Sequence, residues 1–203
     1  MANNPPLQIG ITGGIGSGKS LITRVFSALG IPIYDADTRA RWLMTHHIAL
    51  RQEIEAQFGT AAYLPDGTLN RAYMAAKVFN HTDNVTRINA LVHPRVGEDY
   101  AAWVLAYPHA PYLLKEAALM YESNSYQLLH YTITVYAPLE LRLRRVLQRD
   151  PQRTEQGIQD IIAKQLTEEE RLSKADFVIY NDESQMVLPQ VLALHERFIA
   201  EVR

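Results

Sequence analysis

The segment from Gly13 to Ser20 constrains the fold of this chain more than any other feature. It reads GGIGSGKS and satisfies the pattern G-x-x-x-x-G-K-[ST], whose backbone N–H groups wrap around a phosphate. A β-branched and leucine run, Leu7–Thr12, precedes it, and apolar residues at helical spacing follow from Leu21 to Leu29. The sequence therefore predicts a buried strand, a phosphate-binding loop and a helix in that order, which is the beginning of a parallel α/β fold.

Each residue type in this P-loop (Gly13–Ser20) has a chemical reason to be there. Glycines accept positive φ angles and put no Cβ atoms between the backbone and a phosphate. Lys19 is expected to bridge the β- and γ-phosphates and to stabilise charge during transfer, and the Ser20 hydroxyl is expected to ligate Mg²⁺. A glycine-rich turn that binds nothing is disfavoured by the flanking strand and helix. The pattern predicts that a nucleotide polyphosphate is held by consecutive residues, namely Gly14, Ile15, Gly16, Ser17, Gly18, Lys19 and Ser20.

Four more strands are predicted along the chain, separated by segments in which apolar residues recur at helical spacing. They are 31–34, 112–114, 132–136 and 177–180. Residues 37–110 show only helical patterns, over 42–58, 70–79 and 84–105, the last interrupted at Pro94. We therefore predict an α/β, three-layer P-loop NTPase fold. Residues 1–36 and 111–203 form its five-stranded parallel sheet and nucleotide-binding core, and residues 37–110 form a helical insertion.

The composition excludes several classes of protein. The chain has 203 residues, 20 Lys and Arg against 22 Asp and Glu, and no cysteine. Disulfides, thiolate nucleophiles and cysteine-ligated metals are therefore excluded, and the net charge of −2 disfavours a nucleic-acid binder. Met1–Pro6 lacks the features of a signal peptide, and no apolar run approaches roughly 18 residues, so we expect a cytoplasmic protein without a membrane partner. We expect a monomer or a weak homo-oligomer.

Two aspartates after the second strand favour a small-molecule kinase over a GTPase or a motor. The chain lacks the Asp-x-x-Gly and Asn-Lys-x-Asp segments of GTPases and is short for a motor. Asp35 and Asp37 are expected at the sheet edge from which the P-loop projects, where a carboxylate can orient or deprotonate an acceptor hydroxyl. The alternative for one of them is a cap on the helix that begins near Thr38.

An arginine-rich stretch from Arg142 to Arg153 is a candidate lid. On a helix, Arg142, Arg145 and Arg149 share one edge beside an apolar stripe. An arginine fork binds two phosphate oxygens at once, which suits a lid over the transferred phosphoryl group. We therefore predict a lid over about residues 142–165, with Arg145 and Arg149 as its catalytic arginines. The alternative is a solvated cationic face.

Several motifs together resemble those of dephospho-CoA kinases. They are ITGGIGSGKS, IPIYDADTRAR, LPDGTLNRAYMAAKVFN, INALVHPRV, LQRD and KADFVIYND, in the family's order from near residue 9 to near residue 183. The resemblance implies ATP-dependent phosphorylation of the ribose 3′-hydroxyl of dephospho-CoA, the last step of coenzyme A synthesis, by in-line transfer. The alternatives are another small P-loop kinase that acts on a nucleotide or a metabolite hydroxyl, and a non-catalytic ATP-binding regulator.

The resemblance also implies roles for individual residues. Asp35 would be the base at the 3′-hydroxyl, and Asp37 would orient the substrate or the metal. The backbone N–H of Leu21 would reach the α-phosphate, and Asn181 would lie near the adenine of ATP. In the helical insertion, the positions near the acceptor are Arg71, His93 and Arg95. For His93, which precedes Pro94, a purely structural role is the alternative.

Three positions depart from the family's pattern. Leu21 stands where threonine is common after the loop serine, and only its backbone is needed there. Glu116 stands where many members have aspartate, and the proline two residues later is absent. Ile161, four residues before Gln165, stands where arginine is frequent, and Arg153 is a nearby substitute. The roles of individual lid arginines therefore stay open, whereas the reaction does not depend on this choice.

Overall fold

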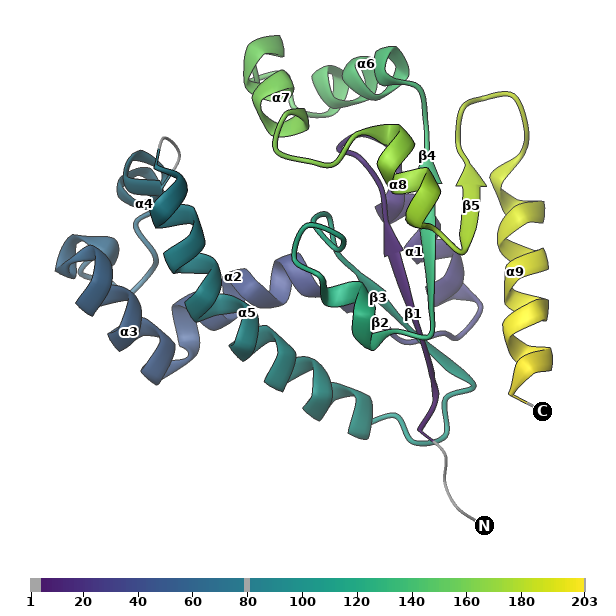
Figure 1. The fold of residues 1–203 in the computed structure, drawn as a ribbon, viewed down its shortest axis with the longest axis horizontal. Coiled ribbons are helices and arrows are strands. Elements are labelled where there is room, and N and C mark those ends of the chain that lie inside the picture. Colours follow the sequence, from purple (N-terminus) through teal and green to yellow (C-terminus); the bar gives the residue numbers. More distant parts are fainter. Residues whose placement is uncertain (1–4, 79–80, 203) are drawn as a thin grey trace. The chain divides into compact units, whose positions relative to one another are not determined.

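The computed structural model of the chain describes residues 5–78 and 81–202 (Figure 1). In these residues five parallel strands form one sheet in the order β2-β3-β1-β4-β5. The strands are β1 (Leu7–Thr12), β2 (Ile33–Asp35), β3 (Tyr112–Glu116), β4 (Tyr131–Tyr136) and β5 (Phe177–Tyr180). This parallel sheet with crossover helices confirms the α/β fold predicted from the sequence.

The chain divides into two compact units. One is made of the chain up to Asp35 and from Val104 onward, and the other spans Ala36–Trp103. The first unit contains the sheet and the helices α1 (Lys19–Ala28), α6 (Leu139–Arg149), α7 (Glu155–Ile162), α8 (Glu168–Lys174) and α9 (Val187–Glu201), with a 3-10 turn at Ser125–Leu128. The second contains α2 (Ala36–His46), α3 (Ile48–Phe58), a 3-10 turn at Thr60–Ala62, α4 (Arg71–Val78) and most of α5 (Thr82–Leu105).

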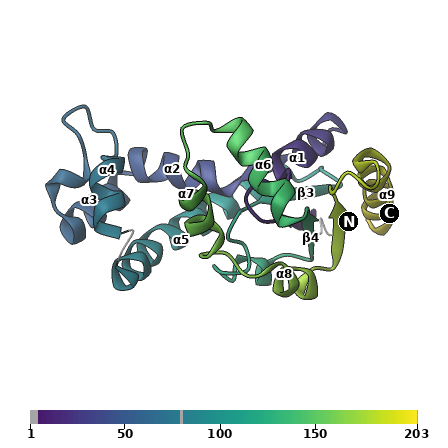
Figure 2. The same ribbon diagram turned by 90° about the horizontal axis from the view of Figure 1, so that it is seen from above.

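The core of the first unit lies between the sheet and the helices α1 and α9. Alternate residues of the central strand, Ile9 and Ile11, are fully buried against Ile22 and Phe26 of α1 and Phe198 of α9. Neighbouring residues on a strand point to opposite faces. On the other face of β4, the buried hydroxyl of Thr134 donates to the Arg171 carbonyl of α8 at 3.4 Å. Figure 2 shows α8 on the side of the sheet opposite to α1. Both faces of the central strands β1 and β4 are therefore covered, as is usual for a parallel sheet.

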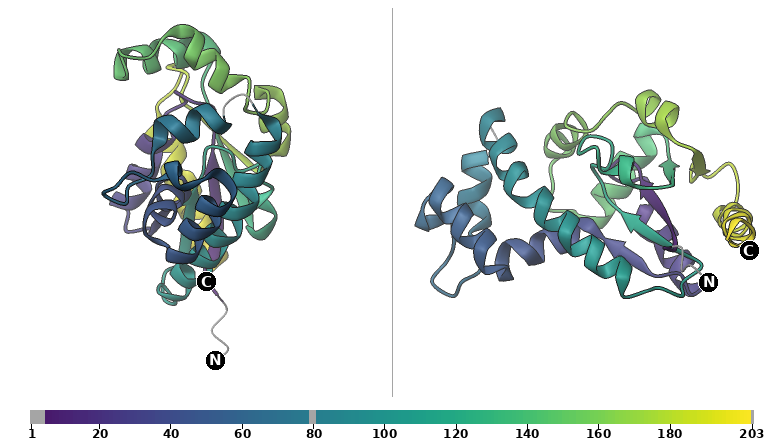
Figure 3. Two further views of the ribbon diagram at one scale, coloured as in Figure 1. Left: turned by 90° about the vertical axis from the view of Figure 1, so that its left-hand side faces the viewer. Right: turned by 60° about the horizontal axis from the view of Figure 1, so that its bottom comes forward.

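The helices of the second unit enclose a separate core (Figure 3). Leu50 and Ile54 of α3 are fully buried there and pack with Leu43 of α2, Met74 of α4 and Val92 of α5. No helix in the described part of the chain combines the length and the apolar character needed to cross a membrane.

Helix boundaries differ from the sequence predictions at two points. The single helix expected over 42–58 is two helices, because His47 separates α2 from α3 and caps α3 by accepting the Leu50 N–H at its Nδ1 (3.2 Å). The interruption expected at Pro94 is absent, since α5 continues through it. A proline inside a helix removes one N–H donor, which costs stability but need not end the helix. The expected end of the 70–79 helix, Phe79, lies outside the described residues.

Candidate active site

The P-loop joins the carboxyl end of β1 to the first turn of α1. Gly18 caps the helix in a left-handed conformation, with φ of 96°, and its carbonyl accepts hydrogen bonds from Leu21 N (3.0 Å) and Ile22 N (3.3 Å). The Leu21 N–H, which was expected at the α-phosphate, is therefore donated to Gly18 in this structure. The positive end of the α1 dipole still favours a phosphate beside the loop. Lys19 Nζ donates to the carbonyl of Gly13 at 2.8 Å and so stays close to the loop.

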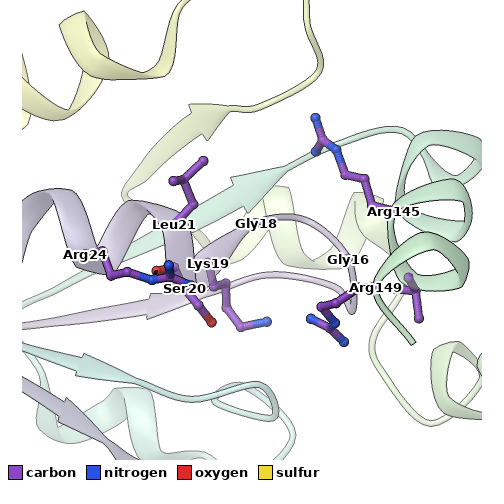
Figure 4. A pocket seen from close by; sticks show the side chains of 9 residues that line it. Gly16, Gly18, Lys19, Ser20, Leu21, Arg24, Arg145 and Arg149 are labelled. Atoms are coloured by element: carbon purple, nitrogen blue, oxygen red, sulfur yellow. Dashed lines mark hydrogen bonds between the residues drawn. The ribbon is translucent and has the colours of Figure 1, made fainter. Parts of the chain in front are cut away.

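A cavity of about 230 Å³ opens between the P-loop and α6. Lys19 and Ser20 line it from the loop, and Arg145 and Arg149 line it from α6. Figure 4 shows the charged ends of Lys19 and Arg149 pointing toward one another beside Gly16, whereas Arg145 extends away from them. Positive charges that converge beside a glycine-rich loop are the arrangement that a polyphosphate needs.

Two carboxylates lie side by side where β2 and β3 end. Asp35 and Glu116 are register partners in this parallel pair of strands. Glu116 accepts hydrogen bonds from Ser20 Oγ (3.2 Å) and Thr23 Oγ1 (3.0 Å), which tie it to the P-loop serine and to α1. Burial raises the pKa of Glu116, and the Thr23 hydroxyl and the Lys19 ammonium oppose this rise. Hydroxyl and carboxylate oxygens thus gather at this edge of the sheet.

The turn after β5 braces the P-loop through Asn181. The side-chain amide of Asn181 donates to the carbonyl of Ser17 at 2.7 Å, and its own backbone carbonyl accepts from Arg145 Nη1 at 2.9 Å. Glu183 pairs with Arg145 at 3.4 Å and with Arg144 at 3.2 Å. Asn181 therefore lies between the P-loop and α6, and Arg145 is held at this turn.

The far end of the predicted lid also reaches the P-loop. Gln165, in the link between α7 and α8, accepts at Oε1 a hydrogen bond from the Ile15 N–H (3.0 Å). The next residue, Leu166, donates its N–H to Glu122 at 2.7 Å. The Gln165 bond holds the link against the P-loop, and the Leu166 bond holds it to the segment that follows β3. No role for Gln165 follows from the sequence alone.

The three arginines that share a helical edge have different surroundings. The Arg142 side chain is only 5% exposed and pairs with Glu168 of α8 at 3.2 Å. Arg145 is partly exposed, and Arg149 is 63% exposed and pairs with Asp150 at 2.9 Å. Helical spacing places the three arginines on one edge of α6. It does not show that the P-loop and α8 cover Arg142.

Four of the five residues expected on the acceptor side belong to helices of the second unit; the fifth, Asp35, ends β2 in the first unit. Asp37 lies in the first turn of α2, where a negative charge also stabilises a helix N-terminus. Arg95 pairs with Glu53 of α3 at 3.0 Å and with Glu98 at 3.2 Å, and these bonds raise the pKa of Arg95. The two others, both exposed, are Arg71 and His93. Within its unit, Arg95 therefore links α5 to α3.

A family model described as dephospho-CoA kinase matches residues 7–186. The match spans most of the chain, from the first strand to the residues after β5. The chain belongs to the dephospho-CoA kinase family. It is therefore a kinase that transfers a phosphoryl group from ATP to dephospho-CoA, and a non-catalytic regulator or another P-loop kinase is not favoured.

Individual relatives agree with this membership in the dephospho-CoA kinase family. A dephospho-CoA kinase of Bacteroides fragilis is 34% identical over 188 residues, which cover 93% of this chain and 91% of the relative. A crystal structure of a Thermus thermophilus protein gives a TM-score of 0.82 with 30% identity, and the alignment covers 98% of this chain and all of that one. The dephospho-CoA kinase of Campylobacter jejuni, 24% identical, gives a TM-score of 0.67 over 96% of this chain and 97% of that one, which supports the fold.

Three side chains of this dephospho-CoA kinase family member enter the site without having been singled out as site residues from the sequence. Glu116 is noticed in the sequence only as a departure from the family's pattern, and its bond to Ser20 gives it a place beside the P-loop. Gln165 and Glu168 follow α7 and reach the P-loop and Arg142, respectively. No local sequence pattern indicates these three contacts, because the two residues of each pair lie far apart in the sequence.

Proposed function

We propose that the P-loop of this chain binds the phosphates of ATP and that the γ-phosphoryl group is transferred in line to the ribose 3′-hydroxyl of dephospho-CoA. The observation that carries this proposal is the cavity beside the P-loop, where Lys19 and Arg149 converge. Developing negative charge is stabilised best by donors that are already in position. Membership in the family identifies dephospho-CoA as the acceptor. The cavity beside the P-loop supports the proposal that the transfer takes place there.

The carboxylates at the ends of β2 and β3 supply the acceptor side of the transfer. We assign Asp35 as the group that orients the 3′-hydroxyl and accepts its proton, because it is exposed at the edge beside Glu116. Lys19, Arg145 and Arg149 neutralise charge on the transferred group, and Arg145 reaches it after leaving Asn181 and Glu183. The backbone of Leu21 and the turn at Asn181 complete the nucleotide site.

The oxygen donors beside the P-loop fit a Mg²⁺ ion that is shared with the nucleotide. Ser20 Oγ and the Glu116 carboxylate already lie within hydrogen-bond distance of one another (3.2 Å). Mg²⁺ prefers oxygen ligands and usually binds through one or two protein groups together with phosphate oxygens. Ser20 would hold the ion, with Glu116 beside it, and the bound ion would neutralise charge on the β- and γ-phosphates.

The second unit is proposed to bind dephospho-CoA. Its exposed arginine Arg71 and its partly buried Asp37 offer a charged and a hydrogen-bonding contact for a nucleotide-like substrate, and His93 is exposed on α5. Arg95 supports α5 through its two ion pairs.

We also propose a cytoplasmic enzyme that is a monomer or a weak homo-oligomer, without nucleic-acid partners. Size-exclusion chromatography with light scattering tests its oligomeric state.

One assay tests the reaction and the base together. ADP release from Mg-ATP is measured with dephospho-CoA, with nucleoside monophosphates and without acceptor, and the product is analysed by phosphorus NMR for a 3′-phosphate. We expect stimulation by dephospho-CoA, and Asp35→Asn is expected to lose turnover while it keeps ATP binding. Glu196→Gln, an exposed carboxylate-to-amide change on α9, is the control and keeps full turnover. Absence of stimulation by dephospho-CoA contradicts the proposal, and an Asp35→Asn variant with a raised KM alone assigns Asp35 to positioning.

A further inference from the structure

Three charged side chains lie together beside the P-loop. The side chains of Arg142 and Arg171 are 5% and 3% exposed, and that of Glu168 is 24% exposed. One carboxylate oxygen, Glu168 Oε2, forms ion pairs with both arginines. It lies 3.2 Å from Arg142 Nη2 and 2.9 Å from Arg171 Nη2. This Arg142–Glu168–Arg171 cluster therefore carries two positive charges against one negative charge.

Both guanidinium groups of the cluster lie against the P-loop at Gly14. A Cβ atom added to Gly14 would collide with Arg142 Nη1 and would come within 3.1 Å of Arg171 Nη2. The backbone carbonyl of Arg142 packs on Gly16, where an added Cβ would come within 2.5 Å of it. Arg142 thus supports the loop at two points, although it is not among the residues that line the cavity.

The cluster by itself is a costly arrangement. Within the described part of the chain, Arg142 Nε, Arg142 Nη1 and Glu168 Oε1 are buried without a hydrogen-bond partner. Burial lowers the pKa of Arg142, Glu168 opposes this change, and Arg171 adds to it. Buried polar atoms without partners and a buried excess of charge both lower stability. An anion on the other side of the loop would balance this charge.

We propose that Arg142 is a positioning residue for phosphate binding: it supports the P-loop at Gly14 and contributes the unbalanced positive charge of the Arg142–Glu168–Arg171 cluster to the nucleotide site. This inference rests on the proposed binding of ATP phosphates by the P-loop. Arg142 acts through the loop backbone and not by contact with the substrate. Its partner Glu168 sets the strength of the effect, because it cancels one of the two positive charges.

A purely structural ion pair predicts different behaviour from this charge-supplying role. If the cluster only held α6 to α8, removal of either Arg142 or Glu168 would destabilise the protein and weaken nucleotide binding together. If the cluster supplies charge, the two removals act on nucleotide affinity in opposite directions. Arg142→Met leaves a balanced pair of Glu168 and Arg171 in place, and apolar replacement of buried charge is often neutral for stability.

The test measures the Kd of Mg-ADP by calorimetry and the Tm without nucleotide, for the full chain and its variants. We expect Arg142→Met to weaken Mg-ADP binding by about 5- to 20-fold, as the loss of one charge in a partly screened site implies, while the Tm without nucleotide stays the same or rises. Arg142→Lys keeps the charge and is expected to stay within about threefold of the wild-type Kd. Glu168→Gln is expected to tighten Mg-ADP binding by about two- to fivefold and to lower the Tm without nucleotide.

The outcomes separate this inference from the proposed function. Weakened binding in both Arg142→Met and Glu168→Gln, or unchanged binding in Arg142→Met, overturns the inference. If Arg142→Met does not fold, Glu168→Gln decides alone, and unchanged or weaker binding in that variant overturns the inference. Lys19→Ala is the reference: if it weakens nucleotide binding while Arg142→Met does not, only the inference fails. If Lys19→Ala leaves Mg-ADP binding unchanged, the assignment of the P-loop itself fails.

Discussion

Replacing Gly18 with alanine tests how the P-loop geometry is maintained. Gly18 has a φ of 96°, and an alanine in this left-handed region is strained by about 1–2 kcal/mol. The new Cβ would also collide with Asn181 Nδ2, so the amide must move and its 2.7 Å hydrogen bond to the Ser17 carbonyl is lost. A lost bond to a partly buried carbonyl costs about 1–3 kcal/mol. The sum predicts a loss of about 2–5 kcal/mol in the free energy of unfolding for Gly18→Ala.

Two other glycines separate the contributions to this loss. Gly30 has a φ of 84° and open space where a Cβ would lie, so Gly30→Ala is expected to lose only the strain of about 1–2 kcal/mol. Gly97 lies inside α5, also with open space, and Gly97→Ala is expected to stabilise by about 0.5–1 kcal/mol. Urea unfolding gives each value, and at about 2–4 °C per kcal/mol the Tm of Gly18→Ala should fall by about 4–20 °C.

A double-mutant cycle isolates the clash with Asn181. Once Asn181→Ala has removed the amide, Gly18→Ala adds strain alone. The loss of stability in the double variant should therefore be smaller than the sum of the two single losses by about 1–3 kcal/mol, the contribution of the lost bond. Mg-ADP affinity, measured on the same samples, should fall for Gly18→Ala and remain unchanged for Gly97→Ala. Equal losses of stability in Gly18→Ala and Gly30→Ala, or full additivity in the cycle, would refute the reasoning.

Three further predictions concern single side chains of the site. Lys19→Ala should lower kcat/KM by about 10²- to 10⁴-fold without loss of Tm, and near-normal turnover in steady-state kinetics would contradict its role. Burial raises the pKa of Glu116 above its ordinary value of 4.5, because the folded state favours the protonated carboxyl. The stability that this protonated carboxyl contributes is fully present below pH 4.5 and is lost as the pH rises through the raised pKa. Glu116→Gln should therefore flatten the pH dependence of urea unfolding over this interval, and an unchanged slope would contradict the assignment. Gln165→Met removes the acceptor of the Ile15 N–H and should cost about 1–2 kcal/mol and raise the KM for ATP, whereas Gln156→Met on the exposed face of α7 should stay within about 0.5 kcal/mol of the wild type.

The parts of the fold that the sequence predicted are those governed by local pattern. The runs at Leu7–Thr12 and Phe177–Tyr180 match the observed strands in both bounds, because β-branched and aromatic residues favour strands. The break at His47 could not be predicted, since apolar spacing continues across it and the cap is a single imidazole nitrogen. At Pro94 the prediction was wrong in the opposite sense, since an interruption was expected and the helix continues. A helix that packs well tolerates the loss of one hydrogen bond.

The P-loop part of the candidate site could be predicted because its residues are consecutive. Residues that come from separate elements could not be brought together in the same way. The P-loop residues are consecutive, so one motif gives the lysine, the serine and the first amides of α1 together. Asp35 and Glu116 come from separate strands, and only the parallel pairing of β2 with β3 brings them into register. Spacing along α6 could identify an arginine edge, but it could not show that Arg142 is buried while Arg149 is exposed.

Three of the connections that the sequence does not predict join the P-loop to segments that follow β4. Ile15 is bonded to Gln165, Ser17 is bonded to Asn181, and Gly14 is packed against Arg142. A loop rich in glycine has little conformational preference of its own, so its shape must come from such contacts. The same contacts connect the P-loop to the α6–α8 region, so any movement of that region must change the support of the loop that is proposed to hold the phosphates. A variant that weakens these contacts should therefore lower the affinity for Mg-ADP, whereas a variant at an exposed α6 residue outside the cavity, such as Glu140→Gln, should not.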